Sequence, residues 1–105
     1  MPEAISISEI THDKVLNLAG HDRGLAARAR FEVDKLDSID EPVDVLFPRD
    51  FRQVSSSFFQ GMFAESVKRL GSVKGFFEHY RFDAPAHVRA KLADYADQVL
   101  ARNPH

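Results

Sequence analysis

A strand and a helix that are close together in the sequence constrain the fold more than any other feature of the chain. Residues 43–47 (Val-Asp-Val-Leu-Phe) are nearly all apolar and β-favouring, which is typical of a strand covered on both faces. After a short connector, residues 58–70 carry a wide apolar stripe at helical spacing, and Gly71 ends the pattern. This combination predicts an α/β domain in which helices pack on a sheet.

The segments before this unit alternate in the same way. Apolar residues at every second position predict a strand over residues 4–10. A helix is predicted over residues 22–36, with Asp22 as N-cap. Its apolar face comprises Leu25, Ala26, Ala29, Val33 and Leu36. Residues 12–20 form either a short strand or a turn, and their pattern does not decide between the two.

The segments after residue 70 complete the alternation. Residues 73–82 predict another strand, and Pro85 in the first turn begins a last helix. The expected order is therefore β-α-β-α-β-α. It predicts a mainly parallel or mixed sheet of three or four strands, packed by about three helices.

Length and composition narrow the function classes. The 105 residues, with 44% apolar and 29% charged, are expected to form a single domain over residues 1–105. A net charge of −2 without a basic stripe argues against nucleic-acid binding. The absence of cysteine excludes disulfides and thiol catalysis. No apolar run is long enough for a membrane span and no signal peptide is visible, so the cytoplasm is the expected location.

Three consecutive serines, Ser55, Ser56 and Ser57, stand at the start of the helix that ends at Gly71. One of them is needed as an N-cap, because the first N–H groups of a helix lack backbone partners. A second serine is then expected to be exposed beside the positive end of the helix dipole. A phosphate would be well placed at such a position.

Basic residues gather between Arg23 and Arg30, at the start of the predicted helix 22–36, where the helix dipole makes them mildly unfavourable. Arg28 is therefore a candidate contact for an anion or a partner, with a solvated helix face as the alternative. Phe31 falls off the apolar face of this helix. It is a second candidate for a partner surface, with packing into a loop as its alternative.

Catalytic and metal-binding motifs are missing from the sequence. The five histidines show no metal-ligand spacing, and the serines lack the flanking glycines of a nucleophile elbow. No glycine-rich phosphate loop is present. We therefore expect no catalytic residue, no metal and no cofactor.

The run from Val45 to Ser57 joins a buried strand, a short connector and serines at a helix start, and it resembles the STAS domains of anti-sigma factor antagonists. The chain is still more similar to the STAS-like family of bacterial and phage proteins, over about residues 20–100. The shared parts are an arginine-bearing first helix, the buried strand, a Val-Ser-Ser-Ser-Phe segment and later phenylalanines: Gly24 to Arg28, Val43 to Phe47, Val54 to Phe58, and Phe76-Phe77 with Phe82.

The resemblance implies a regulatory protein–protein interaction domain. In STAS antagonists, a partner kinase phosphorylates a serine at the helix start, and the unphosphorylated form binds that kinase. The matching position here is Ser56, with Ser55 and Ser57 beside it and with Arg28 as a further candidate contact. Two residues depart from the pattern, since Ser55 replaces an aspartate and Phe58 replaces a glycine.

Three functional hypotheses stay open. The first is a regulatory domain that binds a GHKL-type ATPase or serine kinase, with or without phosphorylation. The second is an accessory or phage-type scaffold that binds another protein without phosphorylation; the missing aspartate, and the missing acidic pair after Phe58, favour it. The third is a small hydrolase-type enzyme with Ser56 or a histidine as catalyst. No feature of the sequence predicts an oligomeric state.

Overall fold

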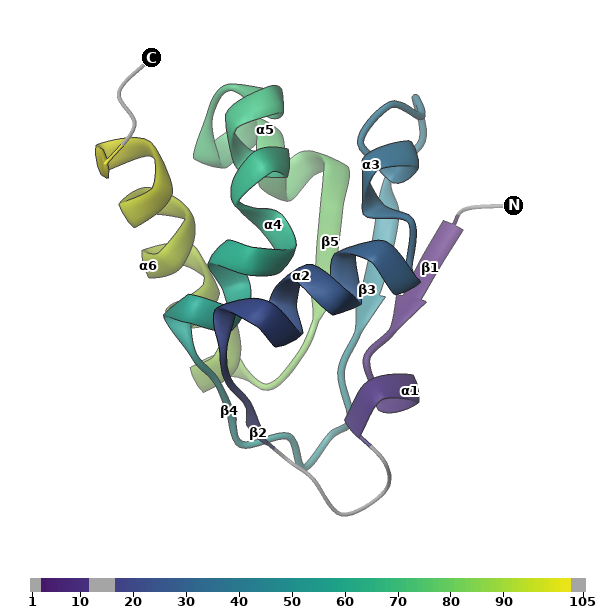
Figure 1. Ribbon diagram of the computed structural model, residues 1–105, viewed down its shortest axis with the longest axis vertical. Helices are drawn as coiled ribbons and strands as arrows, with labels where there is room; N and C mark the ends of the chain where they lie inside the picture. The colour runs from purple at the N-terminus through teal and green to yellow at the C-terminus, as the bar shows by residue number, and fades with distance from the viewer. Residues whose placement is uncertain (1–2, 12–16, 103–105) are drawn as a thin grey trace.

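The computed structural model describes residues 3–11 and 17–102 and has an α/β architecture (Figure 1). This confirms the predicted class. In chain order the elements are β1 (Glu3–Ser6), α1 (Ser8–Thr11), β2 (Asn17–Leu18), α2 (His21–Arg30), α3 (Val33–Leu36), β3 (Val43–Leu46), β4 (Gln53–Val54), α4 (Ser56–Leu70), α5 (Val73–His79), β5 (Tyr80–Asp83) and α6 (Ala86–Arg102). The described residues thus contain more helices than the three expected.

Two small sheets organise the described residues, and every strand pair is parallel. The larger has the order β1-β3-β5, with Val45 of β3 between Ile5 and Phe82. The smaller pairs β2 with β4, and β4 was not predicted. Leu18 belongs to β2, so residues 17–18 form a strand, whereas residues 12–16 lie outside the described residues.

The larger sheet has one buried and one open face. Val43 and Val45 of the central strand are fully buried, whereas Leu46 is 38% exposed. The prediction of a strand covered on both faces is therefore wrong, because β3 alternates between a core side and a solvent side. In Figure 1, α2 crosses in front of β3 and β5, whereas α4 lies beside β5 on the side away from β3, with α6 next to it.

The predicted helix 22–36 is broken in two. Glu32 separates α2 from α3 in a left-handed conformation with φ 53. The predicted N-cap Asp22 lies inside α2, and Gly20, with φ 98, precedes the helix. The expected apolar face was also wrong for α2, because Leu25 is 46% exposed. The buried residues of α2 are instead Gly24, Ala27 and Arg28.

The predicted strand 73–82 is a helix followed by a strand. Ser72 begins α5 as an N-cap, because its Oγ accepts a hydrogen bond from the Gly75 N–H at 2.9 Å. Only Tyr80–Asp83 is extended, as β5. The prediction failed over residues 73–79 because Phe76 and Phe77 are as hydrophobic as strand residues but lie on a short helix, whereas Phe82 does lie on the strand.

The apolar stripe of α4 packs as predicted. Phe59 and Val67 of this helix are buried, and Gly71 ends it with φ 82. A layer of aromatic rings fills the space between α4, α5 and β5, with Phe63 at 5.5 Å from both Phe76 and Phe82 between ring centroids. The helix that begins at the serine triplet is therefore held firmly in the core.

Candidate functional site

The first turn of α4 is capped by Ser55. The Ser55 backbone is extended, and its Oγ accepts a hydrogen bond from the Phe58 N–H at 3.1 Å. The Ser55 N–H in turn donates to the carbonyl oxygen of Leu18 in β2, at 2.8 Å. Ser55 therefore has the structural role that local chemistry requires of one serine.

The other two serines differ in what their hydroxyls contact. Ser57 is exposed, and its Oγ lies 3.0 Å from the Ser55 Oγ, within hydrogen-bond distance. Ser56 is the first residue of α4 and is half-buried. Within residues 3–11 and 17–102, no hydrogen bond engages the Ser56 hydroxyl. Among the described residues, Ser56 is thus the serine of the triplet whose hydroxyl makes no stabilising hydrogen bond.

The backbone beneath the triplet is fixed by a close helix crossing. A methyl group at Gly24 would lie 2.2 Å from the carbonyl oxygen of Phe58, and one at Gly61 would lie 2.3 Å from the carbonyl oxygen of His21. Only glycine allows α2 and α4 to approach this closely. Phe58 is 3% exposed, so the residue that follows the triplet is anchored in the core.

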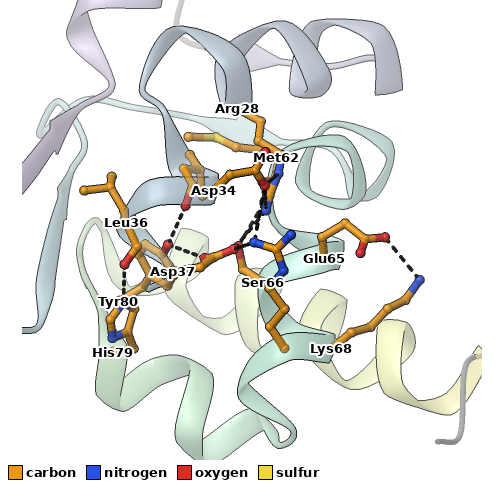
Figure 2. Close-up of polar contacts among 12 residues, drawn as sticks. Arg28, Asp34, Leu36, Asp37, Met62, Glu65, Ser66, Lys68, His79 and Tyr80 are labelled. Atoms are coloured by element: carbon orange, nitrogen blue, oxygen red, sulfur yellow. Dashed lines mark hydrogen bonds and ion pairs between the residues drawn. The ribbon is translucent and has the colours of Figure 1, made fainter. Parts of the chain in front are cut away.

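Arg28 does not lie on the surface. It stands in the last turn of α2 and is only 8% exposed, so neither a partner contact nor a solvated helix face describes it. One guanidinium nitrogen (Nη1) donates to the Met62 carbonyl oxygen at 2.8 Å and to the Ser66 Oγ at 2.9 Å (Figure 2). Another (Nη2) donates to Asp34 at 2.6 Å and to Asp37 at 2.9 Å.

Asp37 joins this cluster to the sheet. Its side chain is 1% exposed and accepts hydrogen bonds from Arg28, from Arg69 at 3.2 Å and from the Tyr80 hydroxyl. We call Arg28, Asp37, Ser66 and Tyr80 the buried polar cluster; Asp34, whose side chain is 68% exposed, contacts Arg28 at its edge. The cluster connects α2, the α3 region, α4 and β5, and Figure 2 shows these side chains converging.

The pKa shifts around Arg28 follow from burial and from the hydrogen bonds and ion pairs that these side chains make. Burial acts to lower the pKa of Arg28, but the hydrogen bonds and charges of Asp34 and Asp37 outweigh it, so the pKa is raised. The hydrogen bond from Arg28 lowers the pKa of Asp34. Burial, followed by the bond to Asp37, raises the pKa of the Tyr80 hydroxyl far above 10.0. The raised pKa of Arg28 and the lowered pKa of Asp34 both favour the charged forms, as expected for partners in an ion pair.

Phe31 is half-buried at the C-cap of α2 and packs against the core, with the Arg30 guanidinium carbon 5.9 Å from its ring centroid. The structure therefore does not gather the sequence candidates at one site. The residues that Arg28 contacts on α4 begin at Met62, six positions after Ser56 and roughly 9 Å further along the helix axis.

The contacts of the histidines bear on catalytic and metal-binding arrangements. In the described part of the chain, no serine hydroxyl is hydrogen-bonded to a histidine; His79 and His87 contact the carbonyl oxygens of Leu36 and Arg52. The same residues contain no group of three metal-ligating side chains. No helix among them is long and apolar enough to cross a membrane.

Comparison with known proteins gives no relative. No family model, no curated protein and no solved structure matches the chain.

Proposed function

We propose that the protein is a regulatory protein–protein interaction domain of the STAS-like type, in which Ser56 is the residue modified by a partner kinase. The observation that carries the proposal is the difference in hydrogen bonding among the three serine hydroxyls. Ser55 caps α4 and Ser57 contacts Ser55, whereas the Ser56 hydroxyl is unengaged among the described residues. The proposed partner is a GHKL-type ATPase or serine kinase in the cytoplasm.

The place of Ser56 suits a charge switch. It is the first residue of a helix of 15 residues, where the backbone N–H groups of the first turn point outward and the dipole end is positive. A phosphate adds close to two negative charges there. Because Phe58 anchors the turn in the core, the added charge changes the surface that a partner meets rather than the fold.

A binding role without phosphorylation is the second candidate. The residue that replaces the aspartate of the STAS pattern, Ser55, is committed to the helix cap. The scaffold would then bind its partner through the same helix start, without the covalent switch. The hydrolase hypothesis has no supporting contact, since no serine–histidine hydrogen bond lies within the described ranges.

Affinity capture from the cells of origin tests the proposal. The baits are the wild type, Ser56→Asp, and Ser57→Asp as a matched control that adds the same charge one position later. We expect the wild type and Ser57→Asp to retain a GHKL-type ATPase or serine kinase, and Ser56→Asp to lose at least about tenfold of it, the equivalent of 1.4 kcal/mol.

The outcomes separate the candidates. Equal recovery of the same partner by all three baits would contradict a charge switch at Ser56 and would favour the scaffold without phosphorylation. Equal loss in both aspartate variants would show that any charge on this turn blocks binding, which removes the special role of Ser56.

A further inference from the structure

The backbone of Phe82 in β5 has a donor and an acceptor to spare. The Asp83 carbonyl oxygen accepts a hydrogen bond from the Phe47 N–H at 2.9 Å, so the backbone groups of Asp83 face β3. Neighbouring residues of a strand alternate in this respect, so the N–H and C=O groups of Phe82 point away from β3. In residues 3–11 and 17–102 no hydrogen bond engages either group. Backbone groups left in this way beside a core are bonded to water or to a ligand.

A hollow lies on this side of β5. It has a volume of about 320 Å³, and residues of α5, β5 and α6 form its walls. The apolar part of the walls comes from Phe77, Phe82 and Leu92, of which Leu92 is fully buried. Small-molecule pockets in proteins range from about 300 to 1,000 Å³. The hollow is at the lower end of this range, so it has room for a small molecule and not for a segment of another chain.

The charged residues of the hollow are all cationic. Of the described residues that line it, two are arginines and none carries a carboxylate. Arg89 of α6 is exposed and forms no ion pair with the described residues. Arg81 of β5 holds Asp44 on β3 through Nε and Nη2, each at 3.0 Å, which leaves its Nη1 group available. Guanidinium groups beside apolar walls select a ligand with an apolar body and an anionic end.

The walls and the donors together define the ligand more closely. A guanidinium matches a planar carboxylate through two parallel N–H···O bonds, and the Phe82 N–H is a further donor on the same side. The rings of Phe77 and Phe82 lie 5.6 Å apart between centroids in an edge-to-face arrangement, and such ring pairs favour an aromatic neighbour. A sugar phosphate would place hydroxyl groups against these apolar walls without hydrogen-bond partners, which is costly.

We propose that the hollow between β5 and α6 binds a small aromatic carboxylate. The ring of the ligand packs on Phe77, Phe82 and Leu92. Its carboxylate accepts hydrogen bonds from the Arg89 guanidinium and from the Phe82 N–H. Ser56 does not line the hollow, so this binding site is independent of the proposed kinase switch and is tested separately from it.

Nuclear magnetic resonance with the full, nitrogen-labelled chain tests the site, and naphthoate is the probe. Amide chemical shifts are recorded while the probe is raised to millimolar concentrations. We expect a saturable shift of the Phe82 amide, because its N–H gains an acceptor. Naphthamide has the same shape as the probe without its charge, and its dissociation constant should be about tenfold higher or more.

Two substitutions on α6 form a matched pair. Arg89→Met removes the guanidinium from the hollow and should raise the dissociation constant of naphthoate about tenfold or more. Lys91→Met removes the same charge from an exposed residue of the same helix that lines a different groove, and it should leave the constant unchanged. Circular dichroism verifies that each variant folds.

A third variant, Ala93→Phe, fills the hollow from its rim and should abolish the binding of naphthoate. If Arg89→Met fails to fold, the contrast between Ala93→Phe and Lys91→Met decides. An unmoved Phe82 amide, equal affinities for naphthoate and naphthamide, or an equal loss in Lys91→Met would each overturn the proposal.

Discussion

Two serines of α4 have opposite surroundings. Ser66 is fully buried, and its hydroxyl accepts a hydrogen bond from Arg28 at 2.9 Å. Ser56, ten positions earlier, is half-buried and has a hydroxyl that no described residue engages. Residue type and helix are the same, so the difference comes from what covers each end of α4.

The cover is α2. It crosses α4 where Gly24 meets Gly61, between the two serines in sequence. Beyond the crossing, Arg28 extends over Ser66. The first turn of α4 meets α2 at the Phe58 carbonyl oxygen and β2 through the Ser55 N–H, and neither contact engages the Ser56 hydroxyl. One end of the helix is therefore used for stability, and the other is the end for which we propose a binding role. This contrast makes the following predictions.

The largest expected effect comes from Arg28→Met. The change removes a cation from the buried carboxylate of Asp37, which is 1% exposed. Breaking one partner of a buried ion pair costs about 3–5 kcal/mol, and we expect the lower end because Arg69 still contacts Asp37. Urea unfolding measures the loss.

The matched control for this change is Arg30→Met on the same helix. Arg30 is 55% exposed and makes a 3.5 Å ion pair with Glu9, so its loss should stay within about 0.5 kcal/mol. Equal effects of the two substitutions would refute the buried role assigned to Arg28.

The helix crossing itself is tested by Gly24→Ala. The added methyl group would meet the Phe58 carbonyl oxygen at 2.2 Å, so α2 must move away from α4. We expect a loss of about 2–3 kcal/mol in the free energy of unfolding. Thermal unfolding that matches the wild type would mean that the two helices are not in close contact.

A smaller effect is expected from Ser55→Ala, which removes the N-cap of α4. The Phe58 N–H loses its side-chain acceptor, and the loss should be about 1 kcal/mol. Ser57→Ala serves as the comparison, because it removes only a hydroxyl contact on the surface, and it should cost less than about 0.5 kcal/mol. A larger loss of stability in Ser57→Ala than in Ser55→Ala, measured by chemical denaturation, would show that Ser55 is not the cap.

The smallest effect, of opposite sign, is expected from Ser56→Asp. A carboxylate at the first residue of α4 interacts favourably with the helix dipole, so stability should rise by about 0.3–1 kcal/mol. Ser66→Asp is the comparison at the covered end of the helix, where a new charge is buried and should be strongly destabilising. A loss of stability in Ser56→Asp would show that this position is not open to a negative group.

Sequence patterns predicted the parts of the fold that depend on local chemistry. A cap supplied by one of the three serines, the apolar stripe and the end of α4 at Gly71 were all predicted, and all three are confirmed, with Ser55 as the cap. The strand at residues 43–46 was also found, but not its exposed face, because Leu46 has the hydrophobicity of a core residue and yet points to solvent.

The missed features depend on partners distant in sequence. Arg28 is buried because Met62 and Ser66, more than thirty positions away, accept its hydrogen bonds. The predicted helix is broken at Glu32, where no glycine or proline marks the break in the sequence. By contrast, α5 did have a local signal, since Ser72 follows the helix-ending Gly71 and caps the next helix.

Mapping the phosphorylated residue is the most direct test of the role proposed for Ser56. The wild-type protein is incubated with ATP and the kinase that it captures from its own cells, and tandem mass spectrometry then locates the phosphate. We predict a phosphate on Ser56 and none on Ser66, which is buried and bonded to Arg28. A phosphate on Ser57 instead of Ser56, or no phosphate while the kinase binds, would contradict the claim.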